Sequence, residues 1–263
     1  LHLFVDVACP NIEDAAEDAA LVVGPPLDDA GPGGRESAGE ALRLVAGIYL
    51  SPQFLRFAGS SLCFVGGFMA LQSLWAVPWL MNVNRLDIGH AARILVLLNL
   101  GMLGGQLSIG LLGTSLARRG VKPLNLMQIG YCLVLFVELL ILFDGGPPAV
   151  LWFLLGLLSA VNSQTYLASA THFPRTLFGR VSTATNLMAF AGAFLMQWGM
   201  GLTLDALKDA GYAMDTALQC VFAGLIALQG LAILPLLREA RLSFRRSGES
   251  PVPAASRRDP RDG

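Results

Sequence analysis

Residues 124–143 read LNLMQIGYCLVLFVELLILF, and this stretch decides the class of fold. It contains one charged residue, Glu138, and no proline. A helix of about 20 mostly apolar residues is long enough to cross the hydrocarbon core of a bilayer. Five further runs of this kind are found, at 58–80, 93–117, 149–170, 181–203 and 216–237. The sequence therefore predicts an all-α integral membrane protein, with a six-transmembrane-helix bundle over residues 58–237.

The composition of the whole chain agrees with a lipid bilayer as its environment. Of the 263 residues, 54% are hydrophobic and 14% are charged, and the mean hydropathy is +0.58. Soluble proteins carry about 25% charged residues. The net charge of −1 gives no reason to expect a nucleic-acid partner. Four cysteines are scattered without metal-ligand spacing, so we expect no metal site and no cofactor.

The segments that flank the apolar runs differ in composition. Residues 1–35 combine many acidic residues with Ala, Gly and Pro, which predicts a flexible acidic cytoplasmic segment. Residues 36–57 show apolar positions at helical spacing and predict an interfacial helix and linker, with the helix ending before Pro52. Residues 238–263 are rich in Arg and Pro and predict a basic, disordered cytoplasmic tail.

Lysine and arginine alternate between the two sides of the predicted bundle. If the N-terminus is cytoplasmic, the outer loops hold only Arg85, Arg93 and Lys208, and all other basic residues fall on the inner side. The positive-inside rule then places both termini in the cytoplasm, with the chain as a multi-pass protein of the cell (inner) membrane.

The loop after the second run reads GTSLARRGVKP at residues 113–123. Gly113, Arg118, Gly120 and Lys122 match the cytoplasmic loop signature of the major facilitator superfamily of transporters, whereas Ala117 occupies its aspartate position. In that family a weakened copy of the signature follows the eighth of twelve helices. The loop therefore resembles one in the second half of such a transporter, although the same basic cluster is also explained as a determinant of topology.

Two other segments carry the same resemblance. The segment LQSLWAVPWL at 71–80 is similar to the end of the seventh helix, and residues 178–199 are similar to the eleventh. Together the segments resemble the C-terminal six-helix half over about residues 50–240. This resemblance implies two inverted three-helix repeats and a secondary active transporter, not an enzyme. Such a protein moves a small-molecule substrate, here unidentified, through a midplane site by alternating access.

One six-helix half supplies only one wall of a midplane site. The resemblance therefore implies a partner, which is either a missing N-terminal half or a second copy of the chain. Residues 1–57 contain no apolar run of about 20 residues and look like the linker that precedes the seventh helix in the family. We accordingly expect a truncated or half transporter.

Polar and aromatic residues at membrane depth are the candidates for a substrate cavity. Gln72, Trp75 and Trp79 fall at i, i+3 and i+7, one face of a regular helix. The fourth run contains a polar stretch that includes Asn162, Gln164 and Tyr166. The resemblance implies that these two helices line the cavity and that the second and fifth flank it, with Asn99, Gln106, Asn186 and Gln197. The alternative is that these side chains form hydrogen bonds between helices without touching substrate.

Two further features leave alternatives open. Glu138 is the only carboxylate well inside a run, which suggests a proton relay, a side chain that reaches the membrane surface, or a local hydrogen bond. Gly101 and Gly105 form a GxxxG pair, which predicts close helix packing.

Two other functions compete with transport. A non-transporting membrane binding or regulatory subunit shares the same hydrophobic pattern. An intramembrane hydrolase needs an activated serine on a Gly-rich element and a histidine at the same depth. The sequence has no G-x-S-x-G motif and places His90 and His172 in loops, which disfavours the hydrolase.

Overall fold

The computed structural model describes residues 38–248, so the acidic segment predicted at 1–35 and the end of the predicted tail, 249–263, lie outside it. Two units make up the chain, residues 1–44 and residues 45–263. Of the first, only the start of helix α3 (Ala38–Leu50) is described. The second contains six helical segments long and apolar enough to cross a membrane, and the described residues form no strand. The predicted six-span, all-α class is therefore confirmed.

The first span begins earlier than the sequence indicated. It runs from Pro52 to Asn82 rather than over 58–80. Ser51 explains this start, because its side-chain oxygen accepts a hydrogen bond from the backbone nitrogen of Phe54 at 3.2 Å, and Pro52 occupies the first helical turn. The segments of this span are α4 (Pro52–Ser60), η2 (Ser61–Val65), α5 (Gly66–Ala70), η3 (Leu71–Trp75) and α6 (Ala76–Asn82).

The third and fourth spans agree with the predicted runs to within one residue, the second begins five residues earlier, the fifth is six residues longer at each end, and the sixth begins two residues earlier. These five spans are α7 (Ile88–Arg118), α8 (Pro123–Leu142), α9 with α10 (Pro148–Ser159 and Asn162–Ala170), η4 with α11 (Arg175–Leu177 and Phe178–Asp209), and α12 (Met214–Gly248). Helix α12 corrects one expectation, since residues 238–248 of the predicted disordered tail are helical. Leu, Ala and Arg favour helix there, and no proline occurs before Pro251.

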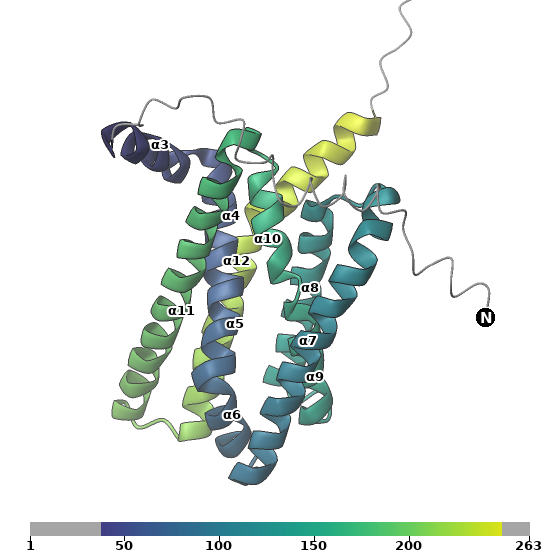
Figure 1. Cartoon of the computed structure of the whole chain (residues 1–263). Helices are drawn as coiled ribbons and strands as arrows, with labels where there is room; N and C mark the ends of the chain where they lie inside the picture. The colour runs from purple at the N-terminus through teal and green to yellow at the C-terminus, as the bar shows by residue number, and fades with distance from the viewer. Residues whose placement is uncertain (1–37, 249–263) are drawn as a thin grey trace, which may run out of the picture. The chain divides into compact units, whose positions relative to one another are not determined.

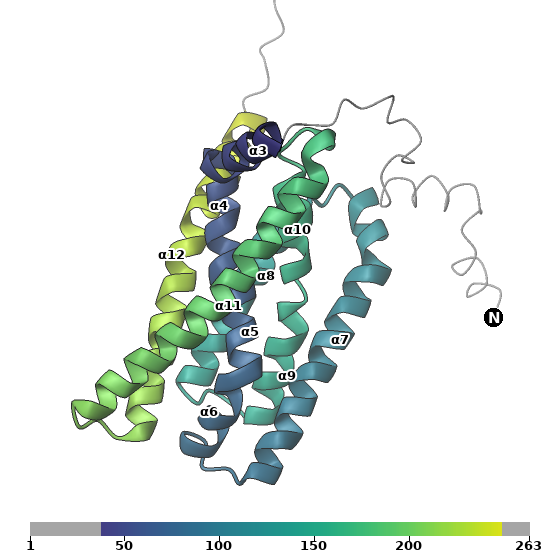
Figure 2. The same ribbon diagram turned by 60° about the vertical axis from the view of Figure 1, so that its left-hand side comes forward.

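Two helix pairs are packed especially closely. Helix α7 lies along α9, and α11 lies along the first span (Figures 1 and 2). A methyl group added to Gly105 of α7 would meet the carbonyl oxygen of Leu157 of α9 at 2.2 Å. One added to Gly192 of α11 would meet the carbonyl oxygen of Leu62 at 2.2 Å. The close packing predicted for the GxxxG pair is confirmed, because Gly101 also lies against the α9 backbone.

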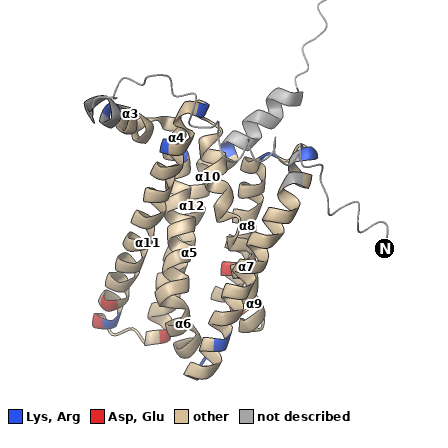
Figure 3. Cartoon of the chain, in the orientation of Figure 1, with Lys and Arg blue, Asp and Glu red and all other residues tan. Residues whose placement is uncertain are grey.

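Charged residues gather at the two ends of the six-span unit (Figure 3). The end where α7 meets α8 carries Arg118, Arg119 and Lys122 without a described acidic side chain. The opposite end carries both signs, and there Arg85 forms an ion pair with Asp215 at 2.7 Å. The spans between these ends are thus nearly free of charge, as a bilayer requires.

Candidate functional site

The first and fourth spans depart from a regular α-helix within their length, whereas the 3-10 turn η4 lies only at the start of the fifth span. In the first, the turns Ser61–Val65 and Leu71–Trp75 are widened π turns. Pro78 accounts for the second widening, because a proline ring clashes with the carbonyl group four residues before it, here that of Leu74. In the fourth span, α9 ends at Ser159 and α10 begins at Asn162. Irregular turns of this kind are frequent at functional sites.

The break in the fourth span coincides with its polar stretch. The Ser159 hydroxyl donates to the carbonyl of Gly156 at 2.7 Å, and the Ser163 hydroxyl donates to that of Ala160 at 2.9 Å. Such bonds from side chain to backbone compete with the helical ladder and bend helices. Asn162 and Gln164, both half-buried, lie directly after the break.

Three hydrogen bonds join residues of the predicted cavity set to neighbouring spans. Gln72 donates to the side-chain oxygen of Asn99 on α7 at 2.5 Å. Gln197 on α11 donates to the hydroxyl of Ser73 at 2.8 Å, and Tyr166 on α10 donates to the side-chain oxygen of Asn186 on α11 at 3.2 Å. The structure thus brings Gln72 together with Asn99, and Tyr166 together with Asn186. Gln106 lies exposed on α7, seven residues after Asn99.

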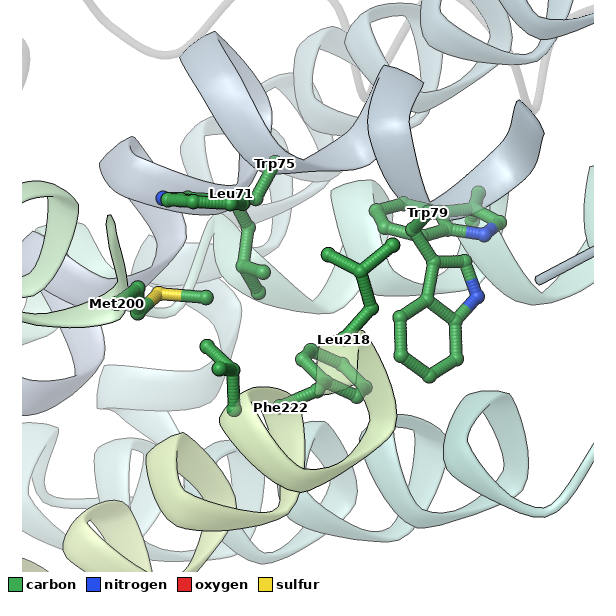
Figure 4. Close-up of a pocket in the computed structure, with 8 residues that line it drawn as sticks. Leu71, Trp75, Trp79, Met200, Leu218 and Phe222 are labelled. Carbon is green, nitrogen blue, oxygen red and sulfur yellow. The ribbon is translucent and has the colours of Figure 1, made fainter. Parts of the chain in front are cut away.

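The two tryptophans of the set lie in the core instead. Trp75 is 8% exposed and Trp79 is 3% exposed, and they surround a cavity of about 10 Å³ with Met200, Leu218 and Phe222 (Figure 4). That volume holds about one water molecule. The widened turn at Leu71–Trp75 changes the phase of the helix, so Gln72 reaches α7 while the indole rings pack inward. Neither indole N–H has an acceptor among the described residues.

A buried seam of hydroxyl groups was not anticipated from the sequence. Ser61 of the first span donates to the backbone oxygen of Thr185 on α11 at 3.0 Å, and the Thr185 hydroxyl lies 3.0 Å from that of Ser169 on α10. Tyr131 of α8 bonds to the hydroxyl of Thr165 on α10. All of these side chains are fully buried. A lone Ser or Thr can also bond to its own helix, so the sequence carried no signal for the seam.

Glu138 is buried and does not reach the membrane surface. It is 1% exposed, and its Oε1 accepts a hydrogen bond from Gln229 Nε2 of α12 at 3.3 Å. The local hydrogen bond was one of the interpretations that the sequence allowed. Its partner was not anticipated, because Gln229 lies 91 residues further along the chain.

The loop with the transporter-like signature forms a tight connection between α7 and α8. Gly120 has φ +77°, which a residue with a side chain adopts only with strain. This conformation lets the backbone nitrogen of Val121 bond to the carbonyl of Leu116 at 3.0 Å and close the end of α7. Arg118 and Lys122 are exposed beside this turn, and Gly113 lies in open space about two helical turns before Gly120.

Among the described residues no group of three or more His, Cys, Asp or Glu side chains could hold a metal ion. No protein-family model, curated protein or solved structure matches the chain. The class of protein rests on the fold alone: the chain is a multi-pass α-helical membrane protein.

Proposed function

We propose that this chain is one half of a secondary carrier of the major facilitator type, which binds a small solute against its exposed polar face. The observation that carries the proposal is the environment of α7 and α11. Within the apolar stretch of each helix, 22% of α7 and 33% of α11 is buried, against 67% of the first span. Yet Asn99 and Gln106 on α7 and Asn186 on α11 are exposed. Polar groups of this kind are costly against lipid, so this face fits a partner and a water-filled cavity.

The order in which the helices pack supports an inverted repeat. The second span packs on the fourth span, and the fifth packs on the first. In the same way the third span packs on the fourth, and the sixth packs on the first. Exchanging the first three spans with the last three leaves these relations unchanged. A glycine lies at two of these contacts: Gly105 where the second span meets the fourth, and Gly192 where the fifth meets the first. Two related three-helix repeats would produce this pattern.

The irregular first and fourth spans support a midplane site. Carriers of this kind use interrupted helices where the backbone lines a cavity rather than lipid. These two spans are equivalent under the exchange described above, and the polar residues Gln72 and Asn162 lie in or beside their irregular turns. We propose that the basic end with Arg118 and Lys122 faces the cytoplasm of the cell membrane, as the positive-inside rule requires.

Water accessibility tests the proposal without knowledge of the solute. Single cysteines replace Asn99, Asn186 or, as a lipid-facing control, Phe136, which is 56% exposed on α8. Each of the three single-cysteine variants is made in a chain without native cysteines and is reconstituted in liposomes. A charged methanethiosulfonate should modify the cysteines introduced at Asn99 and Asn186 rapidly and the one at Phe136 slowly.

Equal, slow modification at all three positions would overturn the proposal, because the polar face would then meet no water. Modification of a non-transporting subunit covered by a protein partner would also be slow. Saturable flux from a chemically verified monomer would contradict the half-carrier part, since one half offers only one wall of the site.

A further inference from the structure

Glu138 and Gln229 form a buried polar pair that the proposed carrier does not use. Both side chains are 1% exposed. Gln229 Nε2 donates to Glu138 Oε1 at 3.3 Å and to the backbone oxygen of Cys63 at 3.4 Å, so it joins α12 to α8 and to the widened turn of the first span. A methyl group on Gly67 would lie 3.2 Å from Gln229 Nε2, so close packing holds the amide in place.

Among the residues that the structure describes, no cation bonds to Glu138. Helix α8 packs against α9, α10 and α12. It meets the first span where the ring of Phe64 stacks on that of Tyr131, with the ring centroids 3.9 Å apart. Helix α9 carries no titratable side chain. The titratable side chains described on the other neighbours are Tyr166, Asp215, Cys220, Arg238, Arg56 and Cys63. None bonds to Glu138: its Oε1 meets only Gln229, and its Oε2 has no partner among the described residues. An ionised carboxylate here would be an uncompensated buried charge.

The hydrogen-bonding groups of the pair also favour a protonated Glu138. Glu138 Oε2 and Gln229 Oε1 are both buried and unpartnered, and both are acceptors when Glu138 is ionised. A proton on Glu138 Oε2 turns one acceptor into a donor. A carboxylic acid and a primary amide can then exchange two hydrogen bonds, with N–H donating to Oε1 and O–H donating to the amide oxygen. One proton satisfies both unpartnered oxygens.

We propose that Glu138 and Gln229 constitute a proton-binding site, in which protonated Glu138 clamps α12 to α8. Release of the proton to water leaves a carboxylate that cannot donate to Gln229. Water must then enter the pair, and α12 loosens from α8 and from the Cys63 carbonyl. The site therefore makes the contact among the first, third and sixth spans dependent on proton concentration.

Infrared spectroscopy of the full chain in detergent tests the protonation directly. At pH 7 the wild type should show the carbonyl stretching band of a protonated carboxylic acid, since no other acidic side chain described by the structure is buried. The band should be absent from Glu138→Gln. It should return in the double variant Glu138→Gln, Gln229→Glu, which exchanges acid and amide. A wild type without this band at pH 7 would overturn the proposal, whatever the variants do.

Thermal unfolding supplies a second measurement. Glu138→Gln keeps a donor at the position of Oε2, so its midpoint should stay constant where the wild type loses stability as the pH rises above neutral. The matched control is Gln128→Leu, because Gln128 also joins α8 to α12, donating to the carbonyl of Leu236 at 2.6 Å, but has no carboxyl partner. This control should lower the midpoint and keep the pH dependence of the wild type. Equal pH profiles for wild type and Glu138→Gln would refute the clamp, as would a wild type stabilised at pH 7 by sodium ions instead of protons.

Discussion

Replacing Gly105 by alanine should destabilise the protein by about 2 kcal/mol. The added methyl group would lie 2.2 Å from the carbonyl oxygen of Leu157 and 2.7 Å from the side chain of Ala160. Ordinary contact begins at 3.4 Å, so α7 must move away from α9 by the difference, about 1.2 Å. A gap of about 1 Å forfeits up to half of each dispersion contact along the seam. Overpacking costs about 1–3 kcal/mol, and against rigid backbone we expect the upper part of this range.

The higher helix propensity of alanine offsets about 1 kcal/mol of that cost. The neighbouring Gly104 isolates this term, because a methyl group there would meet Leu157 at an ordinary 3.7 Å. Gly104→Ala should therefore be neutral or stabilising. Reversible unfolding in mixed detergent and SDS micelles, followed by circular dichroism, measures both variants. Equal shifts for the two alanines, or a more stable Gly105→Ala, would refute the close α7–α9 contact.

Three further predictions concern other parts of the chain. Thr185→Val removes a fully buried hydroxyl that bonds to Ser169, and should cost about 1 kcal/mol in the same unfolding assay without loss of helix content. The side-chain hydrogen bond with His90 lowers the pKa of Asp87 below its ordinary value, and Asp87 also caps α7. Its stabilising effect should be present at neutral pH and fade as the pH falls below about 4, so the melting midpoints of wild type and Asp87→Ala should converge in acid. In intact cells, an impermeant thiol reagent should label Lys208→Cys and spare Lys122→Cys in a background without native cysteines. The reverse labelling pattern would show that the chain has the opposite orientation in the membrane.

Part of the candidate site could be predicted from local pattern. The polar stretch around Asn162 and the proline at Pro78 mark the two irregular spans, because both interrupt the helical hydrogen-bond ladder within their own segment. The face that each side chain occupies could not be predicted. A spacing of i, i+3 and i+7 places Gln72, Trp75 and Trp79 together only on a regular helix, and the widened turn separates the amide from the indoles.

The sequence by itself determined the number and approximate limits of the spans, because apolar length and loop charge are properties of each segment alone. Tertiary structure decided which polar groups meet. Glu138 and Gln229 are 91 residues apart, and Ser61 and Thr185 are 124 apart. Their contacts depend on the depth and rotation of whole helices. These are set where glycines such as Gly105 and Gly192 allow two backbones to touch, and no single segment encodes that arrangement.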